Sequence, residues 1–250
     1  MNHDKFSDSA GVPWDGRSFE ENRFSNDDGS TPPEIQSALD EHSIQSNLKR
    51  VVDSLRGKRL LIPLLATLGD AELGPHGQLV EKSADLAIVA VATPDGKTAI
   101  PAFTSVAEMA AWNKEARPVP VEAERVAISA ISEGHERVIL NAASAAIGIR
   151  RPALAAVAQQ VPWAPPEAVN EVYDLVAQAT SKATHIDSFE LKSGDPHGSL
   201  SAAELKIVLS VRPGLSAEEL NRELTLVASQ LRSEEFLNLV DSVSFQVLAS

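Results

Sequence analysis

Three residues in the middle of the chain, Phe103, Trp112 and Arg117, could form a small-molecule site. An arginine guanidinium stacked on a tryptophan indole can line one wall of a ligand cleft. The same contact can instead close a corner, where the chain leaves a strand and passes through a helix into a Pro-rich stretch. Each residue type has a structural role in such a corner, so the sequence favours the corner and leaves the ligand site open.

A second group, His185, Asp187, Asp195 and His197, has the residue types of a metal site. His185 and Asp187 alternate on an expected strand and therefore share a face, while Asp195 and His197 belong to the loop SGDPHGS. Because Gly, Asp, Pro and Ser are ordinary turn residues, we expect a solvated hairpin loop and no metal. The Walker, Rossmann and Gly-x-Ser-x-Gly patterns are also absent, so we expect no cofactor and assign no catalytic residue.

Three aromatic residues, Trp14, Phe19 and Phe24, lie in an acidic and polar stretch near the N-terminus. Residues 1–31 lack a helical or strand period and are expected to be a disordered acidic tail. Exposed aromatic side chains are unusual in such a tail. They predict either a motif that folds on a protein partner, or docking back on the chain's own domain, or drift without a role.

The composition limits the classes of function. The 250-residue chain is 43% hydrophobic but only 4% aromatic, which predicts an aliphatic core. It has no cysteine, which excludes disulfides and thiolate metal sites. Its formal net charge of -13 repels phosphate, so we expect no direct binding to nucleic acid. The apolar run at 60–68 is too short for a membrane span and no signal pattern is present, which predicts a cytoplasmic protein.

Periodicity predicts a helical lead-in at 32–56, with Ile44, Leu48, Val51, Val52 and Leu55 on one apolar stripe. An α+β unit at 57–149 follows, with strands, a hairpin at Pro94-Asp95-Gly96, and helices over 106–112 and 122–132. Ser105 and Glu108 have the spacing of a capping box at the first of these helices.

The amino-acid composition of the chain changes at residue 150. A short helix and a Pro-rich connector occupy 150–166, and a second α+β unit is expected over 167–250. In this unit, alternating strands predict an antiparallel hairpin followed by a helical crossover. Ser216 and Glu219 match a capping box at the crossover helix. The expected fold class is α+β, with two small units of mixed sheet and helix.

Four stretches, EKSADLAIVAV, AIPAFTSVAEMAAW, ARPVPVEAERVAISAISEG and RVILNAA, together resemble the N-terminal domain of the SseB family, named for enhanced serine sensitivity. The resemblance covers about residues 48–146, and the C-terminal half looks like the companion region of longer bacterial members. The family pattern maps onto Glu81-Lys82-Ser83, Pro101, Phe103-Thr104-Ser105, Trp112 and Arg117-Pro118. It departs at Asn141-Ala142, where many members have Asp-Pro, which puts any role of that Asp in doubt here.

The resemblance implies an α+β fold and a bacterial, cytoplasmic setting, and it supplies no catalytic residue or cofactor. One hypothesis is a non-enzymatic adaptor or regulatory protein that holds an unknown protein partner and is linked by the family's name to serine tolerance. The alternative is a sensor or enzyme for a small ligand such as an amino acid, with a cleft near Glu81, Lys82, Phe103, Trp112 and Arg117. We expect neither nucleic acid nor membrane as a partner, and the oligomeric state is left open.

Overall fold

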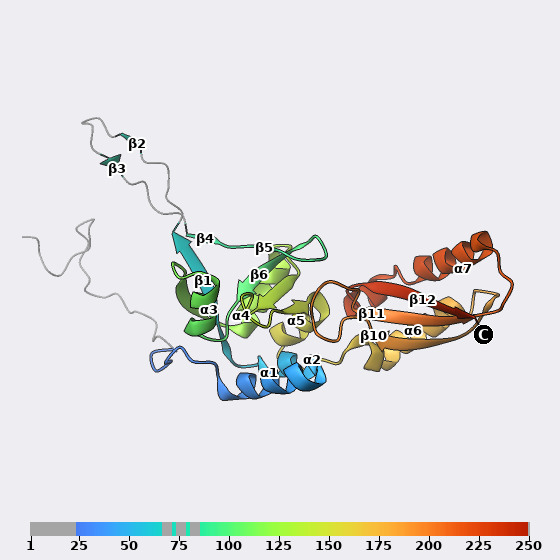
Figure 1. Ribbon diagram of the computed structural model, residues 1–250, viewed down its shortest axis with the longest axis horizontal. Coiled ribbons are helices and arrows are strands. Elements are labelled where there is room, and N and C mark those ends of the chain that lie inside the picture. The colour runs from blue at the N-terminus through green and yellow to red at the C-terminus, as the bar shows by residue number, and fades with distance from the viewer. Residues whose placement is uncertain (1–23, 67–71, 74–78, 81–85, 250) are drawn as a thin grey trace, which may run out of the picture.

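The computed structural model describes residues 24–66, 72–73, 79–80 and 86–249, and it shows two units that each combine helices with strands (Figure 1). The elements of the first unit are α1 (Pro33–Gln45), α2 (Leu48–Ser54), β1 (Arg59–Ala66), β2 (Glu72–Leu73), β3 (Leu79–Val80), β4 (Leu86–Ile88), β5 (Val91–Ala92), β6 (Thr98–Ala102), α3 (Val106–Trp112), β7 (Arg117–Glu122), α4 (Ala123–Ser132), β8 (Arg137–Leu140), β9 (Ile147–Arg150) and α5 (Arg151–Ala158). Those of the second are η1 (Pro166–Ala168), α6 (Asn170–Thr180), β10 (Ile186–Ser193), β11 (Leu205–Val211), α7 (Ala217–Gln230), α8 (Glu234–Leu239) and β12 (Val243–Ala249). The predicted α+β class is confirmed.

In the described part of the first unit, the strands form two larger sheets and the short hairpin β2–β3. One sheet has the antiparallel order β4-β1-β7, and the other has the order β5-β6-β8-β9. In the second sheet β6 and β8 run parallel, and their register pairs Ala102 with Leu140 at their carboxyl ends. Because parallel strands end at the same edge, the loops that follow β6 and β8 leave the sheet side by side.

The two larger sheets of the first unit meet where β6 ends. Phe103 donates its backbone N–H to Leu61 of β1 at 2.9 Å and accepts the Leu61 N–H at 2.8 Å. The chain thus passes from the sheet of β6 to the sheet of β1 within a few residues. Ser105 then begins α3, and its side chain accepts the Glu108 N–H. Between β6 and α3 the chain therefore turns from one sheet to the other.

Small and aliphatic side chains form the core of the first unit, as the composition predicts. Its buried members are Ile35, Ala38, Val51, Val52, Leu55, Leu60, Ile100, Ala102, Ala123, Val126, Ala127, Ala130, Val138, Leu140, Ile147, Ile149, Ala153, Leu154, Ala156, Val157 and Trp163. Each fully buried Val, Leu or Ile side chain stabilises the fold by about 1.5–3 kcal/mol before conformational entropy is subtracted. Trp163 lies in the Pro-rich connector, which therefore contributes to this core.

The predicted helical lead-in is two helices, so the prediction of one continuous apolar stripe was wrong at Ile44. Ser46 has a φ of 55° and ends α1 through its N–H bond to the His42 carbonyl. Asn47 then caps α2 by accepting the Arg50 N–H. The break rotates α1 relative to α2, and Ile44 is 80% exposed while Val51 is fully buried.

The second unit confirms the predicted hairpin and helical crossover. β10 pairs with β11 in antiparallel orientation, and β12 returns parallel to β11 on its other side. The core side chains of the strands point to one face, where α6, α7 and α8 cover them. The buried members of this core are Val172, Val176, Ala179, Ala183, Leu205, Ile207, Leu209, Val211, Val227, Leu231, Phe236 and Val240.

The capping box of α7 gives a direct test of helix stability. The Ser216 side chain accepts the Glu219 N–H, and the Glu219 carboxylate accepts the Ser216 N–H at 2.8 Å. Ser216→Ala is expected to lower the free energy of unfolding by about 0.5–2 kcal/mol in urea denaturation. Ser229→Ala, an exposed change on the same helix, is the control and should not lower the free energy of unfolding. Equal losses in the two variants would contradict the capping role.

Candidate functional site

Phe103 and Trp112 contact each other at the corner between the sheets. Their ring centroids are 5.4 Å apart, and Phe103 is fully buried while Trp112 is half-buried. Leu61 and Met109 complete this small apolar cluster. Arg117 is exposed. It lies in β7, where it pairs with Leu64 of β1. Phe103 and Trp112 therefore have a packing role.

The other half of the predicted cleft, Glu81 and Lys82, lies outside the described residues. The cleft therefore remains a prediction. Of the predicted docking aromatics, Trp14 and Phe19 also lie outside the described residues. Phe24 is half-buried, and its carbonyl accepts the Asp27 N–H at 3.0 Å.

The end of the predicted tail is fixed to the first unit by Asp27. Its carboxylate pairs with Arg59, which is only 6% exposed and also donates to the carbonyls of Ser30 and Thr104. The hydrogen bond from Arg59 lowers the pKa of Asp27 against the opposing effect of burial. A further bond joins the Val106 N–H to the Gly29 carbonyl at 2.9 Å. Residues 27–31 are therefore an ordered lead into α1.

The four residues with metal-ligand types have separate partners. The His185 ring contacts Glu223 at 2.6 Å, and Asp187 pairs with Arg212 at 2.9 Å. Asp195 is buried against Arg150, and His197 bonds to Ser46. Among the described residues, no group of three or more His, Cys, Asp or Glu side chains is arranged to hold a metal ion.

A pocket of about 380 Å³ opens where the parallel strands β6 and β8 end, and we call it the carboxyl-edge pocket. Its walls come from α1, from the loops after β6 and β8, and from one loop of the second unit. The lining residues are Thr31, Gln36, Leu39, Asp40, His42, Ser43, Thr104, Glu108, Asn141, Ser144, Ala145, Ala146, Ile147 and His197. Ligands commonly bind at the carboxyl ends of parallel strands, because the loops there can present polar groups together.

Asn141 organises the floor of the carboxyl-edge pocket. It is 5% exposed, and its φ of 51° turns the chain away from β8. Its side-chain oxygen accepts the Thr104 N–H at 3.0 Å, and its amide nitrogen donates to the Thr104 hydroxyl at 3.1 Å. The Thr104 hydroxyl is also 2.9 Å from that of Thr31. Asn141 thus ties the two strand-end loops and the lead into α1 together.

Glu108 differs from its predicted capping role. Ser105 does cap the Glu108 N–H, but the Glu108 carboxylate accepts the Ser144 hydroxyl at 2.6 Å. The bond from Ser144 holds Glu108 at the rim of the carboxyl-edge pocket. Asn141 and Ser144 were not predicted as site residues. The available signal was the departure from the family pattern at Asn141-Ala142, together with the tolerance of Asn for a positive φ.

Two histidines from different units meet at the pocket. His42 of α1 is 6% exposed, and its Nε2 lies 3.2 Å from the carbonyl of His197. Their rings also approach edge to face, with centroids 6.4 Å apart. Gly198, next to His197, accepts the Gly148 N–H of β9 at 2.6 Å. His197 is therefore the lining residue that the second unit supplies to the carboxyl-edge pocket.

A buried ion network joins the two units at the amino end of β8, the opposite end from this pocket, and its main members are Arg137, Arg150, Asp195 and Asp241. Arg137 begins β8 and Arg150 ends β9, and both donate to the same Asp241 oxygen, at 2.7 and 3.1 Å. Arg150 also donates to Asp195 at 2.6 Å. All four side chains are at most 4% exposed. Hydrogen bonds from Ser199 and Arg150 hold the pKa of Asp195 below its usual value, although burial alone would raise it.

Glu204 lies next to the buried ion network. Its carboxylate accepts the Asp241 N–H at 2.7 Å, and its own N–H donates to the Ser242 hydroxyl at 3.0 Å. Burial raises the pKa of Glu204 to about 7, helped by the carboxylates of Asp241 and Glu167 against the effect of the Arg150 guanidinium. Burial also raises the pKa of Glu167. Both glutamates line a cavity of about 120 Å³ between the units.

One serine hydroxyl lies next to a histidine ring beside the carboxyl-edge pocket. Ser46 Oγ lies 3.0 Å from His197 Nδ1, and this is a serine–histidine pair. A catalytic pair needs a third group that orients the base. Among the described residues no carboxylate bonds to the His197 ring, so the pair lacks its orienting group.

No helix of the described residues is both long and apolar enough to cross a membrane. Residues 35–156 match the family model described as the SseB protein N-terminal domain. The matched range extends from α1 into α5, and so it contains the predicted lead-in helices as well as the strands. The comparisons with curated proteins and with solved structures gave no match.

Proposed function

The chain belongs to the SseB family through the domain at residues 35–156, and on that premise we propose that it is a non-enzymatic, cytoplasmic regulatory protein that binds a small polar molecule. The binding site of this proposal is the carboxyl-edge pocket. The observation that carries it is the pocket's position, since β6, β8, α1 and a loop of the second unit all border it. A bound molecule would bridge the two units.

The pocket's chemistry favours a ligand with hydroxyl, amine or amide groups. Its charged side chains are acidic, Asp40 and Glu108, and its other polar groups are hydroxyls, amides and imidazoles. Carboxylates accept hydrogen bonds from an ammonium, and Ser, Thr and Asn side chains match a hydroxyl or a carboxylate. Free amino acids carry this combination, and the family's name makes serine the first to test.

Ligand binding is tested by thermal unfolding with each of the common amino acids, serine included. At roughly 100 times Kd a ligand adds about 2.7 kcal/mol of stability, which raises Tm by about 5–10 °C in a chain of this size. We expect at least one amino acid to produce this shift. Ala146→Trp, which fills the pocket from an exposed position, should abolish it.

Ala110→Trp is the matched control, because Ala110 is exposed on α3 and does not line the pocket. It should keep the full ligand-induced shift. The proposal is wrong if no amino acid stabilises the protein, or if Ala146→Trp responds as the unchanged chain does. The Tm of each variant without ligand shows whether it is folded.

A further inference from the structure

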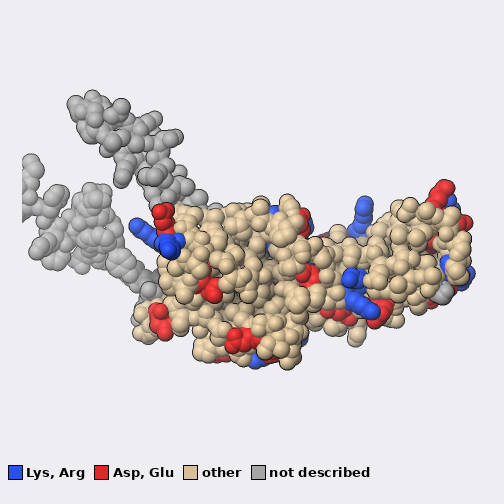
Figure 2. Space-filling model, viewed as in Figure 1, with Lys and Arg blue, Asp and Glu red and all other residues tan. Residues whose placement is uncertain are grey.

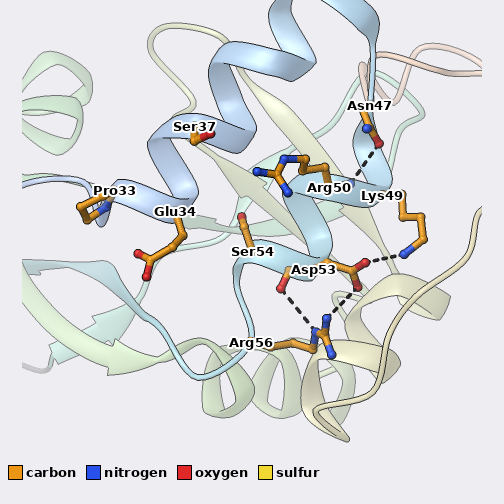
Figure 3. A pocket seen from close by; sticks show the side chains of 9 residues that line it. All are labelled: Pro33, Glu34, Ser37, Asn47, Lys49, Arg50, Asp53, Ser54 and Arg56. Carbon is orange, nitrogen blue, oxygen red and sulfur yellow. Dashed lines mark hydrogen bonds and ion pairs between the residues drawn. The ribbon is translucent and has the colours of Figure 1, made fainter.

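A groove of about 790 Å³ lies between α1 and α2, on a different part of the first unit from the carboxyl-edge pocket. We call it the α1–α2 groove. Its lining residues are Pro33, Glu34, Ser37, Asn47, Lys49, Arg50, Asp53, Ser54 and Arg56. Figure 3 shows Arg50 extending from α2 toward α1, while Lys49 and Arg56 converge on Asp53. Three of the nine residues that line the groove are therefore basic.

The charge of the α1–α2 groove is opposite to that of the chain. Its lining holds three bases, Lys49, Arg50 and Arg56, and two acids, Glu34 and Asp53, so its formal charge is +1. The chain as a whole carries -13. On the face shown in Figure 2, acidic and basic side chains are scattered over both units and form no continuous basic surface. The groove is thus a local positive site on an acidic protein.

Each base of the groove has a carboxylate partner, but two of the three bases share one carboxylate. Lys49 and Arg56 share the single carboxylate of Asp53, which also accepts the Trp163 N–H at 3.1 Å. Arg50 pairs at 2.6 Å with Glu41, which does not line the groove. The side chains of Lys49 and Arg50 are 46% and 51% exposed. Exposed ion pairs are weak, so an incoming carboxylate can replace them at little cost.

We propose that the α1–α2 groove docks an acidic segment of a partner protein. Peptide carboxylates can bind Lys49, Arg50 and Arg56 while uncharged residues of the same peptide pass over Glu34 and Asp53. A nucleic acid fits less well, because its evenly spaced phosphates would meet these two carboxylates and the chain's overall negative charge. The inference does not depend on the carboxyl-edge pocket, since that pocket shares no lining residue with the groove.

Fluorescence anisotropy of a labelled peptide of about twelve residues, rich in Glu and containing one Phe, tests this docking on the full chain. The peptide should bind, and its affinity should fall as salt is raised. The double variant Lys49→Gln/Arg50→Gln should weaken binding by about tenfold. The control Arg125→Gln/Arg222→Gln removes the same charge from exposed sites outside the groove and should change affinity by less than about twofold.

Four results would overturn the proposal. The first is equal binding of a matched peptide with Gln in place of Glu. The second is an equal loss in the control variant. The third is tighter binding of a labelled oligonucleotide or of vesicles rich in phosphatidylserine, at the same groove residues. The fourth is tighter binding of a peptide copied from residues 13–24 of this chain, which would assign the groove to the chain's own tail. Circular dichroism of each variant checks that α2 is intact.

Discussion

Asp241→Asn is expected to lower the free energy of unfolding by about 3–5 kcal/mol. Asp241 is 3% exposed, and one of its carboxylate oxygens accepts hydrogen bonds from both Arg137 and Arg150. Asparagine keeps the size of the side chain but removes the negative charge. Two buried guanidinium groups would then lose a shared counter-charge, which leaves Arg137 paired with Asp95 and Arg150 paired with Asp195.

The effect should be large because each arginine would keep only one of the two carboxylates that it now bonds to. Arg137 already has one nitrogen, Nη1, that is buried without a hydrogen-bond partner among the described residues. Its other bonds go to Asp95 at 2.9 Å and Asp241 at 2.7 Å. Breaking a buried ion pair leaves an uncompensated charge, whereas breaking an exposed pair usually costs less than about 1 kcal/mol.

Urea denaturation measures this difference, with Asp187→Asn as the control. Asp187 pairs with Arg212 at 2.9 Å, but both side chains are exposed, at 38% and 60%. The control should therefore change stability by less than about 1 kcal/mol. A loss below about 1 kcal/mol for Asp241→Asn would show that the junction between the units does not depend on this network.

The local parts of the fold could be predicted from the sequence because their signals are close together in the chain. The helix from residue 106 to 112 has a Ser cap and apolar residues at helical spacing, and the structure places α3 at those bounds. The capping box of α7 rests on two residues three positions apart. Ile44 was wrongly placed on the apolar stripe. The periodicity of apolar residues did not show that the helix ends at Ser46, whose left-handed conformation separates α1 from α2.

The junction could not be predicted, because its partners are far apart in sequence. Arg137 and Arg150 each stand at the end of a short apolar strand, which is an unusual place for a fully buried base. That is a signal for a buried counter-charge, but it does not say which acid supplies it. Asp241 is more than ninety positions from Arg150, and the chain has 35 Asp and Glu residues to choose from.

The carboxyl-edge pocket was missed for a similar reason. The sequence pointed to Phe103 and Trp112, whose aromatic side chains are used in packing the corner. The polar groups of the pocket come from α1, two strand-end loops and the second unit. Thr104 and Asn141 are 37 residues apart and meet only because β6 and β8 are parallel neighbours. Sheet order, which one sequence does not reveal, determines the site.

Glu204 should make the stability of the protein depend on pH near neutrality. Its pKa is raised from 4.5 to about 7 because burial disfavours the charged form. The carboxyl group is protonated in both the folded and the unfolded chain at low pH. As pH rises past the pKa that Glu204 has in the unfolded chain, the unfolded chain loses this proton while the folded chain keeps it. The free energy of unfolding therefore falls over this range. The loss is complete above the folded pKa.

Glu204→Gln removes this titration and keeps an oxygen that can accept the Asp241 N–H. The free energy of unfolding of the unchanged chain, minus that of Glu204→Gln, should fall by about 2 kcal/mol between pH 5.5 and 7.5. Glu190→Gln, an exposed change in β10, should give a difference that stays flat over the same range. A flat difference for Glu204→Gln, or one that rises with pH, would mean that Glu204 is already ionised in the folded protein. In that case Arg150, and not burial, would set its charge state.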